Sequence, residues 1–490
     1  MFKKMPKTVR ELEPVEIWNH FVDLNSVPRP SKKEDRIIEF MMQFGKGLGL
    51  ETSKDEIGNV IINKPASKGM ESKKTIVLQS HLDMVHQKNG STTFDFDKQG
   101  IEMFMEDDWV KAKGTTLGAD NGIGVASIMT VLASTTIAHP AIEALFTIDE
   151  ETGMTGALNL KGGLLNGKIL LNLDTEDDNE LTIGCAGGID VTATGSYTLE
   201  AAPPDVSIYK VFVTGLTGGH SGMDIYKGRG NANKIMNRIL LNAFEKFGIQ
   251  IISIDGGSLR NAIPRESVAE FVIPEKDEKA IESFITAIEL ELKAECKTTD
   301  PNLSVRIEKI EEKRRVLQKG FQGKLMKSLY ACANGVYRMS PDILHLVQSS
   351  NNLARVLVKD GEYSIQCLTR SSVNSEKMDL ANTLKYTFEL IGARVEFKGS
   401  YPGWTPNPDA SIVKIMSELY KELYNENALV SACHAGLECG ILGTNYPEME
   451  MISFGPNIRG AHSPDEKAQI SSVQKFWSFF LETLKRIPNN

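Results

Sequence analysis

The sequence predicts an α/β fold with a mostly parallel sheet covered by helices, interrupted by a long α+β insertion. Strand-like apolar runs alternate with helical stretches over the first 186 residues, which is typical of a parallel sheet. The pattern changes near the glycine-rich stretch GCAGGID, and the first pattern returns after Tyr401. A chain of 490 residues is also too long for one core.

The first part is predicted from the spacing of its apolar residues. A period near 3.6 indicates a helix, whereas short runs of β-branched and aliphatic residues indicate buried strands. The expected helices cover 14–22, 33–48 and 120–133, and the expected strands cover 59–63, 75–78, 141–148 and 169–173. After the insertion we expect a helix at 410–424, a strand at 448–454 and a closing helix at 471–487.

The insertion shows two successive groups of strands and helices with the same element order. We therefore expect two tandem ferredoxin-like α+β halves. The predicted boundaries are 1–186 and 403–490 for a discontinuous outer domain, and 187–402 for the inserted domain.

Composition excludes several classes of protein. The formal net charge of −9 and the pI of about 5.6 are unlike the basic character of a nucleic-acid binder. No apolar core follows the early lysines, which argues against a secretory signal, and the longest apolar runs are too short for a membrane span. The six cysteines are scattered, which is typical of reduced thiols. We expect a cytoplasmic protein without nucleic-acid or membrane partners.

Polar side chains follow three apolar strands directly, in the stretches IVLQSHLD, ALFTIDEE and ILLNLD. Alone, each candidate has a simpler interpretation: His81 as a surface or core histidine, Asp120 in GADNGIG as a helix N-cap, and Glu150-Glu151 as a solvated loop. Together they would meet at the carboxyl edge of the sheet, where open α/β sheets form their sites. Carboxylates gathered there would repel one another unless a divalent cation were present.

These stretches resemble the M20 metallopeptidases, and most closely their aminoacyl-histidine dipeptidase branch. The similarity runs from end to end in the order of the family, and we find no departure at a position expected to bind metal. The matching stretches are SHLDMV (80–85), GADNGIG (118–124), TIDEETGMTGA (147–157), NLD (172–174), GGHSGMDI (218–225), NAIPRE (261–266), HAGLECG (434–440) and GPNIRGAHSPDE (455–466).

The resemblance implies a zinc-peptidase-like catalytic domain that holds two divalent metal ions. Asp120 would bridge the ions, His81 and Asp174 would complete one site, and Glu151 and His462 would complete the other. Such ligands suit zinc, and Mn²⁺ or Co²⁺ could substitute. The family pattern also implies a cis peptide bond after Asp120.

The resemblance also assigns the catalytic groups. Glu150 would be the general base for a metal-bridging water that attacks the peptide carbonyl. Asp83 would accept a hydrogen bond from the second ring nitrogen of His81 and orient it. In the inserted lid, His220 would stabilise the oxyanion. The expected substrate-binding residues are His220, Asn261, Arg370 and Gly436, with Arg370 holding the terminal carboxylate.

The expected function is metal-dependent hydrolysis of unblocked dipeptides, including Xaa-His substrates such as carnosine. Two alternatives stay open: an M20-type deacylase of N-acyl amino acids, and a non-catalytic binding protein on the same scaffold. The long insertion would let one chain complete its own site, and the sequence leaves a homodimer open. Among the other histidines, His86 is expected to face water, and His434 is a weaker candidate for the pocket.

Overall fold

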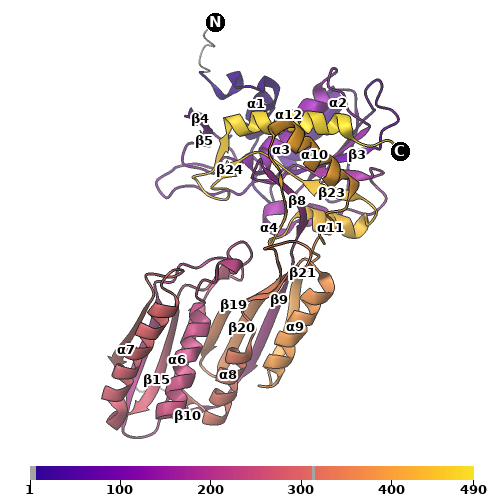
Figure 1. The fold of residues 1–490 in the computed structure, drawn as a ribbon. Helices are drawn as coiled ribbons and strands as arrows, with labels where there is room; N and C mark the ends of the chain where they lie inside the picture. The colour runs from indigo at the N-terminus through magenta and orange to yellow at the C-terminus, as the bar shows by residue number, and fades with distance from the viewer. Residues whose placement is uncertain (1–6, 312–314) are drawn as a thin grey trace. The chain divides into compact units, whose positions relative to one another are not determined.

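The structure is a computed structural model that describes residues 7–311 and 315–490. The chain forms two compact units (Figure 1). Unit 1 comprises residues 1–184, 404–432 and 437–490, and unit 2 comprises 185–403 and 433–436. The sequence placed the boundaries at 186/187 and 402/403. The short segment 433–436, which it assigned to the outer domain, clusters with unit 2.

Unit 1 is built on a mixed sheet with strand order β1-β2-β6-β3-β7-β23-β8-β22. Strands β6, β3, β7 and β23 at its centre are parallel, and β1, β2 and β8 pair antiparallel with their neighbours. The strands are β1 Glu51–Lys54, β2 Val60–Lys64, β3 Ile76–His81, β6 Ile142–Thr147, β7 Ile169–Asn172, β8 Glu180–Cys185, β22 Leu429–Cys433 and β23 Glu450–Ser453.

The helices of unit 1 cover this sheet and confirm the expected α/β class. Every residue of β3 and β6 is buried, as in a strand covered on both faces. Helix α3 packs on β3, and α1 packs on α3. The helices are η1 Val9–Glu11, α1 Val15–Asn25, α2 Asp35–Gly47, α3 Ala119–Ala133, α4 Glu150–Gly153, α5 Thr155–Asn159, α10 Ser411–Tyr424, α11 Glu438–Asn445 and α12 Ile470–Arg486.

A smaller antiparallel sheet in unit 1 has the order β24-β25-β5-β4. Its strands are β4 Met103–Glu106, β5 Trp109–Ala112, β24 Ile458–Arg459 and β25 Lys467–Gln469. Ile458 pairs with Ala468 and Arg459 with Lys467, so residues 460–466 form a closed loop between β24 and β25. This sheet therefore fixes the loop that carries His462. No helix within the described ranges has an apolar stretch long enough to span a bilayer.

Unit 2 is built on an antiparallel sheet with the order β16-β11-β15-β13-β19-β20-β9-β21, to which β18 adds by pairing with β19. The main strands are β9 Gly187–Ser196, β11 Val206–Thr214, β13 Gln250–Gly257, β15 Ser267–Pro274, β16 Ser304–Ile310, β18 Gly335–Met339, β19 Val347–Lys359, β20 Glu362–Ser371 and β21 Arg394–Tyr401. Shorter strands are β10 Leu199–Ala201, β12 Gly219–His220, β14 Ala262–Ile263 and β17 Arg315–Leu317.

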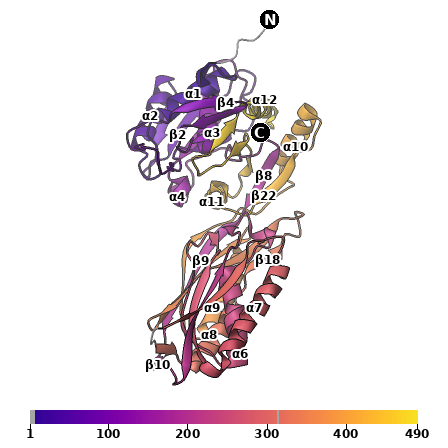
Figure 2. The same ribbon diagram turned by 90° about the vertical axis from the view of Figure 1, so that its left-hand side faces the viewer.

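The long helices of unit 2 lie on one face of this sheet (Figure 2). They are α6 Ala232–Phe247, α7 Glu278–Glu295, α8 Lys319–Ala331 and α9 Asn374–Glu389, with the short η2 Ile225–Lys227 and η3 Glu275–Asp277 elsewhere. Their apolar stripes and the inner face of the sheet form one core that runs from Ile189 to Ala393.

The two α+β halves of unit 2 are nested in the sequence, which revises the tandem arrangement that we expected. Elements β11-α6-β13-β15-α7-β16 form one βαββαβ half, and β9-α8-β19-β20-α9-β21 form the other. Strand β9 precedes the first half in the chain but pairs with β20 and β21 of the second half. The sequence did not predict β9, because this strand begins with glycines, which are rare in strands. A Cβ on Gly187 would lie 2.4 Å from the nitrogen of Gly403, so the close approach of two backbones requires glycine.

Candidate active site

Neighbouring parallel strands bring the predicted polar side chains to one edge of the sheet in unit 1. His81 ends β3 and pairs in register with Thr147, the last residue of β6. Glu150 and Glu151 begin the short helix that follows β6, and Asp174 lies two residues beyond the end of β7. Because β6, β3 and β7 are adjacent, these side chains converge as the sequence predicted.

Asp120 reaches the same place from the first turn of α3. Gly118 before it has φ of +70°, and Asp120 and Asn121 have non-helical dihedral angles inside the assigned helix. The Asp120-Asn121 peptide bond is cis, as the resemblance implied. The side-chain amide of Asn121 donates to Oδ1 of Asp174 and to the carbonyl of Leu173, both at 2.6 Å. These bonds tie the start of α3 to the segment after β7.

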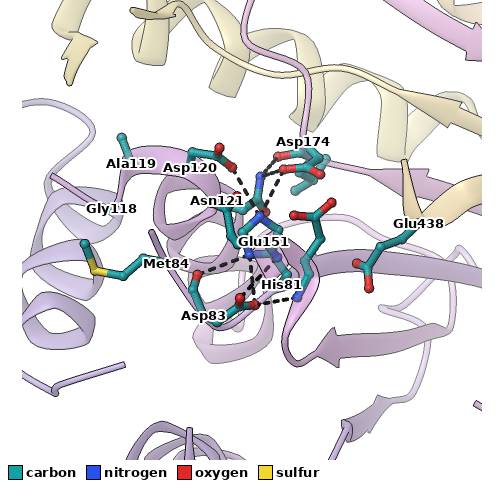
Figure 3. A network of polar contacts seen from close by, with 12 residues as sticks. His81, Asp83, Met84, Gly118, Ala119, Asp120, Asn121, Glu151, Asp174 and Glu438 are labelled. Carbon is teal, nitrogen blue, oxygen red and sulfur yellow. Dashed lines mark hydrogen bonds and ion pairs between the residues drawn. The ribbon is translucent and has the colours of Figure 1, made fainter. Parts of the chain in front are cut away.

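The carboxylate of Asp120 is shared between two groups of side chains, and Figure 3 shows the group that it forms with His81 and Asp174. Its Oδ1 lies 3.2 Å from Nε2 of His81, which is also 3.5 Å from Oδ1 of Asp174. Its Oδ2 lies 3.2 Å from Nε2 of His462, which is 2.9 Å from Oε2 of Glu151. Within each group the ligand atoms lie within 4.8 Å of one another. The geometry matches two adjoining metal sites that share one carboxylate.

The charges in this cluster fit a bound cation. Burial raises the pKa of Glu151 to about 7 and also raises that of Asp174, and the nearby charge of Asp120 adds to both shifts. Hydrogen bonds to Asp120 and Glu151 raise the pKa of His462 to about 11. Oε1 of Glu151 is buried without a hydrogen-bond partner among the described residues. Divalent cations would take the place of the protons and satisfy this oxygen.

Asp83 lies beside Nδ1 of His81, the ring nitrogen that does not contact Asp120. Its Oδ1 is 3.4 Å from Nδ1 of His81 and accepts the backbone N–H of Glu150 at 3.0 Å. Its Oδ2 accepts the hydroxyl of Ser31 at 2.8 Å and the N–H of Glu151 at 3.3 Å. Burial opposes ionisation of Asp83, but these hydrogen bonds outweigh it and lower the pKa. Nδ1 of His81 also lies 3.1 Å from the backbone carbonyl of Asp83, so both the backbone and the side chain of Asp83 contact the ring, and its carboxylate holds the N–H groups of the two glutamates.

Glu150 forms no part of the two groups centred on Asp120, but it lies close enough to His81 and Glu151 to form a third possible group with them. Burial raises its pKa well above the ordinary range, and Asp174, Glu151 and Glu438 add to the effect. A carboxylate with a raised pKa can accept a proton from water and give it up again near neutral pH. This is the environment that a general base requires.

Unit 2 brings His220 and Asn261 together in a short two-stranded ladder. His220 pairs with Ala262 across β12 and β14, and the N–H of Ser221 donates to the carbonyl of Asn261 at 2.8 Å. Nδ1 of His220 accepts the backbone N–H groups of Gly222 and Met223 at 3.2 and 3.0 Å. These bonds place the proton of the neutral ring on Nε2.

Arg370 and His434 form a second polar group in unit 2. Arg370 is buried in β20, donates to the hydroxyl of Tyr401 at 2.9 Å, and keeps Nε without a partner among the described residues. Ser350, which pairs with Arg370 across β19 and β20, lies 2.7 Å from Nε2 of His434. Burial, together with the neighbouring Arg370 and His220, lowers the pKa of His434 to about 3. Gly436 belongs to the same short segment, 433–436.

The sequence did not single out several buried charges around the site, namely Arg29, Glu438 and Glu466. Glu438 accepts hydrogen bonds from Gln79 and Thr147, both at 2.6 Å, and lies near the glutamates of the cluster (Figure 3). Only its position within HAGLECG pointed to it. Glu466 likewise ends the motif GPNIRGAHSPDE, but Arg29 and Glu466 bind backbone groups far away in the sequence, and no local pattern reveals these contacts.

The chain resembles known proteins over nearly its whole length. Residues 77–486 match the model of peptidase family M20/M25/M40. The cytosol non-specific dipeptidase of Escherichia coli (strain K12) is 40% identical over 478 residues, which cover 98% of this chain and 99% of that protein. The crystal structure of aminoacylhistidine dipeptidase from Vibrio alginolyticus superposes with a TM-score of 0.92 at 41% identity, covering 99% of both chains.

A more distant solved structure shares the fold alone. The aminopeptidase PepT of Bacillus cereus ATCC 10987 superposes with a TM-score of 0.57 at 16% identity, covering 97% of this chain and 99% of that chain. Together with the strand-end ligands described above, the matches over residues 77–486 and over 98% of the chain show that this protein belongs to peptidase family M20/M25/M40.

Proposed function

We propose that this protein is a dinuclear metal-dependent dipeptidase. The observation that carries the proposal is the shared carboxylate of Asp120, which presents one oxygen to His81 and the other to His462, each at 3.2 Å. His81 and Asp174 would hold one ion with Asp120, and Glu151 and His462 would hold the other. Two imidazoles and three carboxylates favour zinc, with Mn²⁺ or Co²⁺ as substitutes.

Bound divalent cations would supply the Lewis acidity that polarises a peptide carbonyl and acidifies water. Glu150 would accept the proton of the attacking water at its carboxylate and deliver it to the leaving amine. Asp83 supports this role because it holds the backbone N–H groups of Glu150 and Glu151. The protein thus fixes the general base and a ligand through one buried side chain.

The candidate substrate-binding residues all lie in unit 2, within the segment 187–402 that we propose as a lid domain and the adjoining 433–436. Nε of Arg370 is a buried donor without a partner among the described residues, which suits a substrate carboxylate. His220 carries its proton on Nε2 and could donate it to the oxyanion. We assign Asn261 and Gly436 to substrate binding on the resemblance and on their neighbours His220 and His434.

The proposed substrates are unblocked dipeptides, including Xaa-His. Two relatives that cover nearly the whole chain support this class: one is named a non-specific dipeptidase and the other an aminoacylhistidine dipeptidase, at 40% and 41% identity. The name of the E. coli protein places that relative in the cytosol. We propose a cytoplasmic location here as well, with small-molecule substrates as the partners.

The test is hydrolysis of a small panel by protein stripped of metal and reconstituted with zinc, manganese or cobalt. Ala-Ala, Gly-His and carnosine represent dipeptides, and acetyl-ornithine represents N-acyl amino acids. We expect cleavage of the dipeptides only after a metal is restored. Cleavage of acetyl-ornithine alone would indicate a deacylase, and absence of all cleavage after reconstitution would indicate a binding protein.

A further inference from the structure

We propose that Arg29 and Glu466 are positioning residues of the metal centre, which together hold the turn Leu117–Asp120 and thereby aim both oxygens of Asp120. The proposal rests on the metal centre of the proposed function. Neither residue belongs to a group of candidate ligands, and both are buried in unit 1. They act on the backbone of the turn from opposite sides.

Glu466 holds the N–H side of the turn. Its Oε2 accepts the backbone N–H groups of Leu117 and Gly118 at 2.7 and 2.9 Å. Its Oε1 accepts those of Ala119 and Asp120 at 2.7 and 3.2 Å. The first N–H groups of a helix have no partner within the helix, and a carboxylate suits their positive end. One side chain thus binds four successive backbone N–H groups where the chain enters α3.

Arg29 holds the carbonyl side of the same turn. Its Nη2 donates to the carbonyl of Gly118 at 2.6 Å and to Oδ1 of Asn25 at 2.9 Å. The amide of Asn25 donates in turn to the carbonyl of Leu117 at 2.9 Å. Burial lowers the pKa of Arg29 to about 10, against the nearby charge of Glu466 and other carboxylates. The guanidinium therefore stays charged at neutral pH.

Arg29 also joins the turn to the end of β3. Its Nη1 donates to the carbonyls of Leu82 and Asp83 at 3.0 and 3.1 Å. Glu466 stands four positions after His462, on the same loop between β24 and β25. The pair therefore connects three segments that carry candidate ligands: the end of β3, the start of α3 and the loop after β24.

The turn has little room to relax if these contacts are lost or altered. A Cβ at Gly118 would lie 2.5 Å from Nη2 of Arg29, and one at Gly122 would lie 2.7 Å from the same atom. Gly118 also has φ of +70°, which favours glycine. The backbone is thus packed directly against the guanidinium, so the position of Arg29 sets the position of the turn.

Arg29 and Glu466 would make the same contacts if they served only the stability of the fold. A matched control variant separates that structural role from a role in metal binding. Glu143 in β6 is a buried carboxylate that accepts the backbone N–H groups of Asn166 and Gly167, at 2.9 to 3.0 Å. It lies at the amino end of the parallel strands, away from the edge that carries the ligands. Replacing Glu143 removes the same kind of contact without touching the Asp120 turn.

The experiment measures zinc affinity of metal-free protein by competition with a chromophoric chelator, for wild type and for Glu466→Asp, Glu466→Gln, Arg29→Lys and Glu143→Gln. All tryptophans, at 18, 109, 404 and 477, lie in unit 1, so their fluorescence reports its stability in the metal-free state. We expect both zinc-binding steps to weaken by about tenfold or more in the Glu466 and Arg29 variants, because Asp120 serves both groups. Glu143→Gln should lower stability and leave zinc affinity unchanged.

Glu466→Asp separates position from charge, since the shorter carboxylate keeps the charge but cannot span the turn. Wild-type zinc affinity in Glu466→Asp, or an equal loss in Glu143→Gln at equal loss of stability, would overturn the proposal. If Glu466→Gln fails to fold, Glu466→Asp and Arg29→Lys decide. Failure of wild type itself to bind zinc would instead refute the proposed function, so the two failures are distinguishable.

Discussion

Oδ1 of Asp120 lies 3.2 Å from Nε2 of His81 at the carboxyl edge of the sheet. The two residues come from different elements, the end of β3 and the first turn of α3. Since the other oxygen of Asp120 faces His462, a change at Asp120 affects both groups of candidate ligands, whereas a change at His462 affects one. Variants at Asp120 and at His462 should therefore differ in how many metal ions they lose.

Glu150→Gln should retain the metals and lose turnover. The amide keeps the shape of the side chain but cannot accept the proton of water. We expect kcat for Gly-His to fall by about 10²- to 10⁴-fold, the usual contribution of a general base. Metal analysis of the same sample is the control, because loss of zinc would assign Glu150 to the ligands instead. Near-normal turnover with metal bound would show that another group takes the proton.

Asp83→Asn should weaken zinc binding by about 10- to 100-fold, the usual effect of losing the partner of a ligating histidine. The amide cannot accept from His81 and from the N–H groups of Glu150 and Glu151 together. Chelator competition on the metal-free protein measures the change. Ser31→Ala is the control, since it removes one hydroxyl from Oδ2 of Asp83, and should have a much smaller effect. An equal loss of zinc affinity in both variants would show that Asp83 has no special role in metal binding.

Arg370→Ala should impair substrates with a terminal carboxylate. Losing a charge-assisted hydrogen bond of about 1.5–3 kcal/mol should lower kcat/KM for Ala-Ala by about 10- to 100-fold. The amide of Ala-Ala should be a poor substrate for wild type and should lose little more in the variant. Arg355→Ala is the matched control, because Arg355 lies on the neighbouring strand and pairs with Asp255. An equal loss for the acid and the amide would exclude a carboxylate clamp.

His434 should make the stability of unit 2 depend on pH. Burial lowers its pKa in the folded protein to about 3 from 6.5, so the unfolded chain takes up the proton more readily between these values. The free energy of unfolding is unaffected by the titration of His434 above pH 6.5, and it declines as the pH falls toward 3. His434→Gln should therefore flatten the pH dependence of the free energy of unfolding in this window, by up to about 1.4 kcal/mol per pH unit.

Urea unfolding followed by far-ultraviolet circular dichroism at several pH values measures this dependence. His86→Gln is the control, because the side chain of His86 is exposed. If the free energy of unfolding depended on pH equally in wild type and in His434→Gln, the titration of His434 would not affect stability. That result would contradict the prediction.

Elements with strong local signals could be predicted from the sequence. The spacing predicted a helix over 410–424, and α10 spans Ser411–Tyr424, where Asn425 ends the helix at φ of +55°. Strand β9 was missed because the glycines at its start serve close backbone packing against Tyr401 and Gly403. The nested order of the halves follows from β9 and was missed with it.

The candidate ligands could be found in the sequence because they stand directly after apolar strands or inside recognisable motifs. Arg29 could not, because its partners are backbone groups in turns more than fifty residues away in the chain. Glu466 ends the motif GPNIRGAHSPDE, but nothing in that motif points to its contact with the turn at Leu117. Such contacts depend on tertiary structure and leave no periodic pattern. Glu438 is intermediate, since a motif contains it but only the structure shows its contact with Gln79 and Thr147.

The most direct test of the dinuclear centre is a zinc titration of metal-free protein that follows binding and Gly-His hydrolysis together. We expect two equivalents of zinc per chain in wild type, hydrolysis that depends on them, loss of both binding steps in Asp120→Asn, and loss of one in His462→Ala. Hydrolysis that persists in the metal-free protein, or two equivalents bound with wild-type affinity by Asp120→Asn, would contradict this expectation.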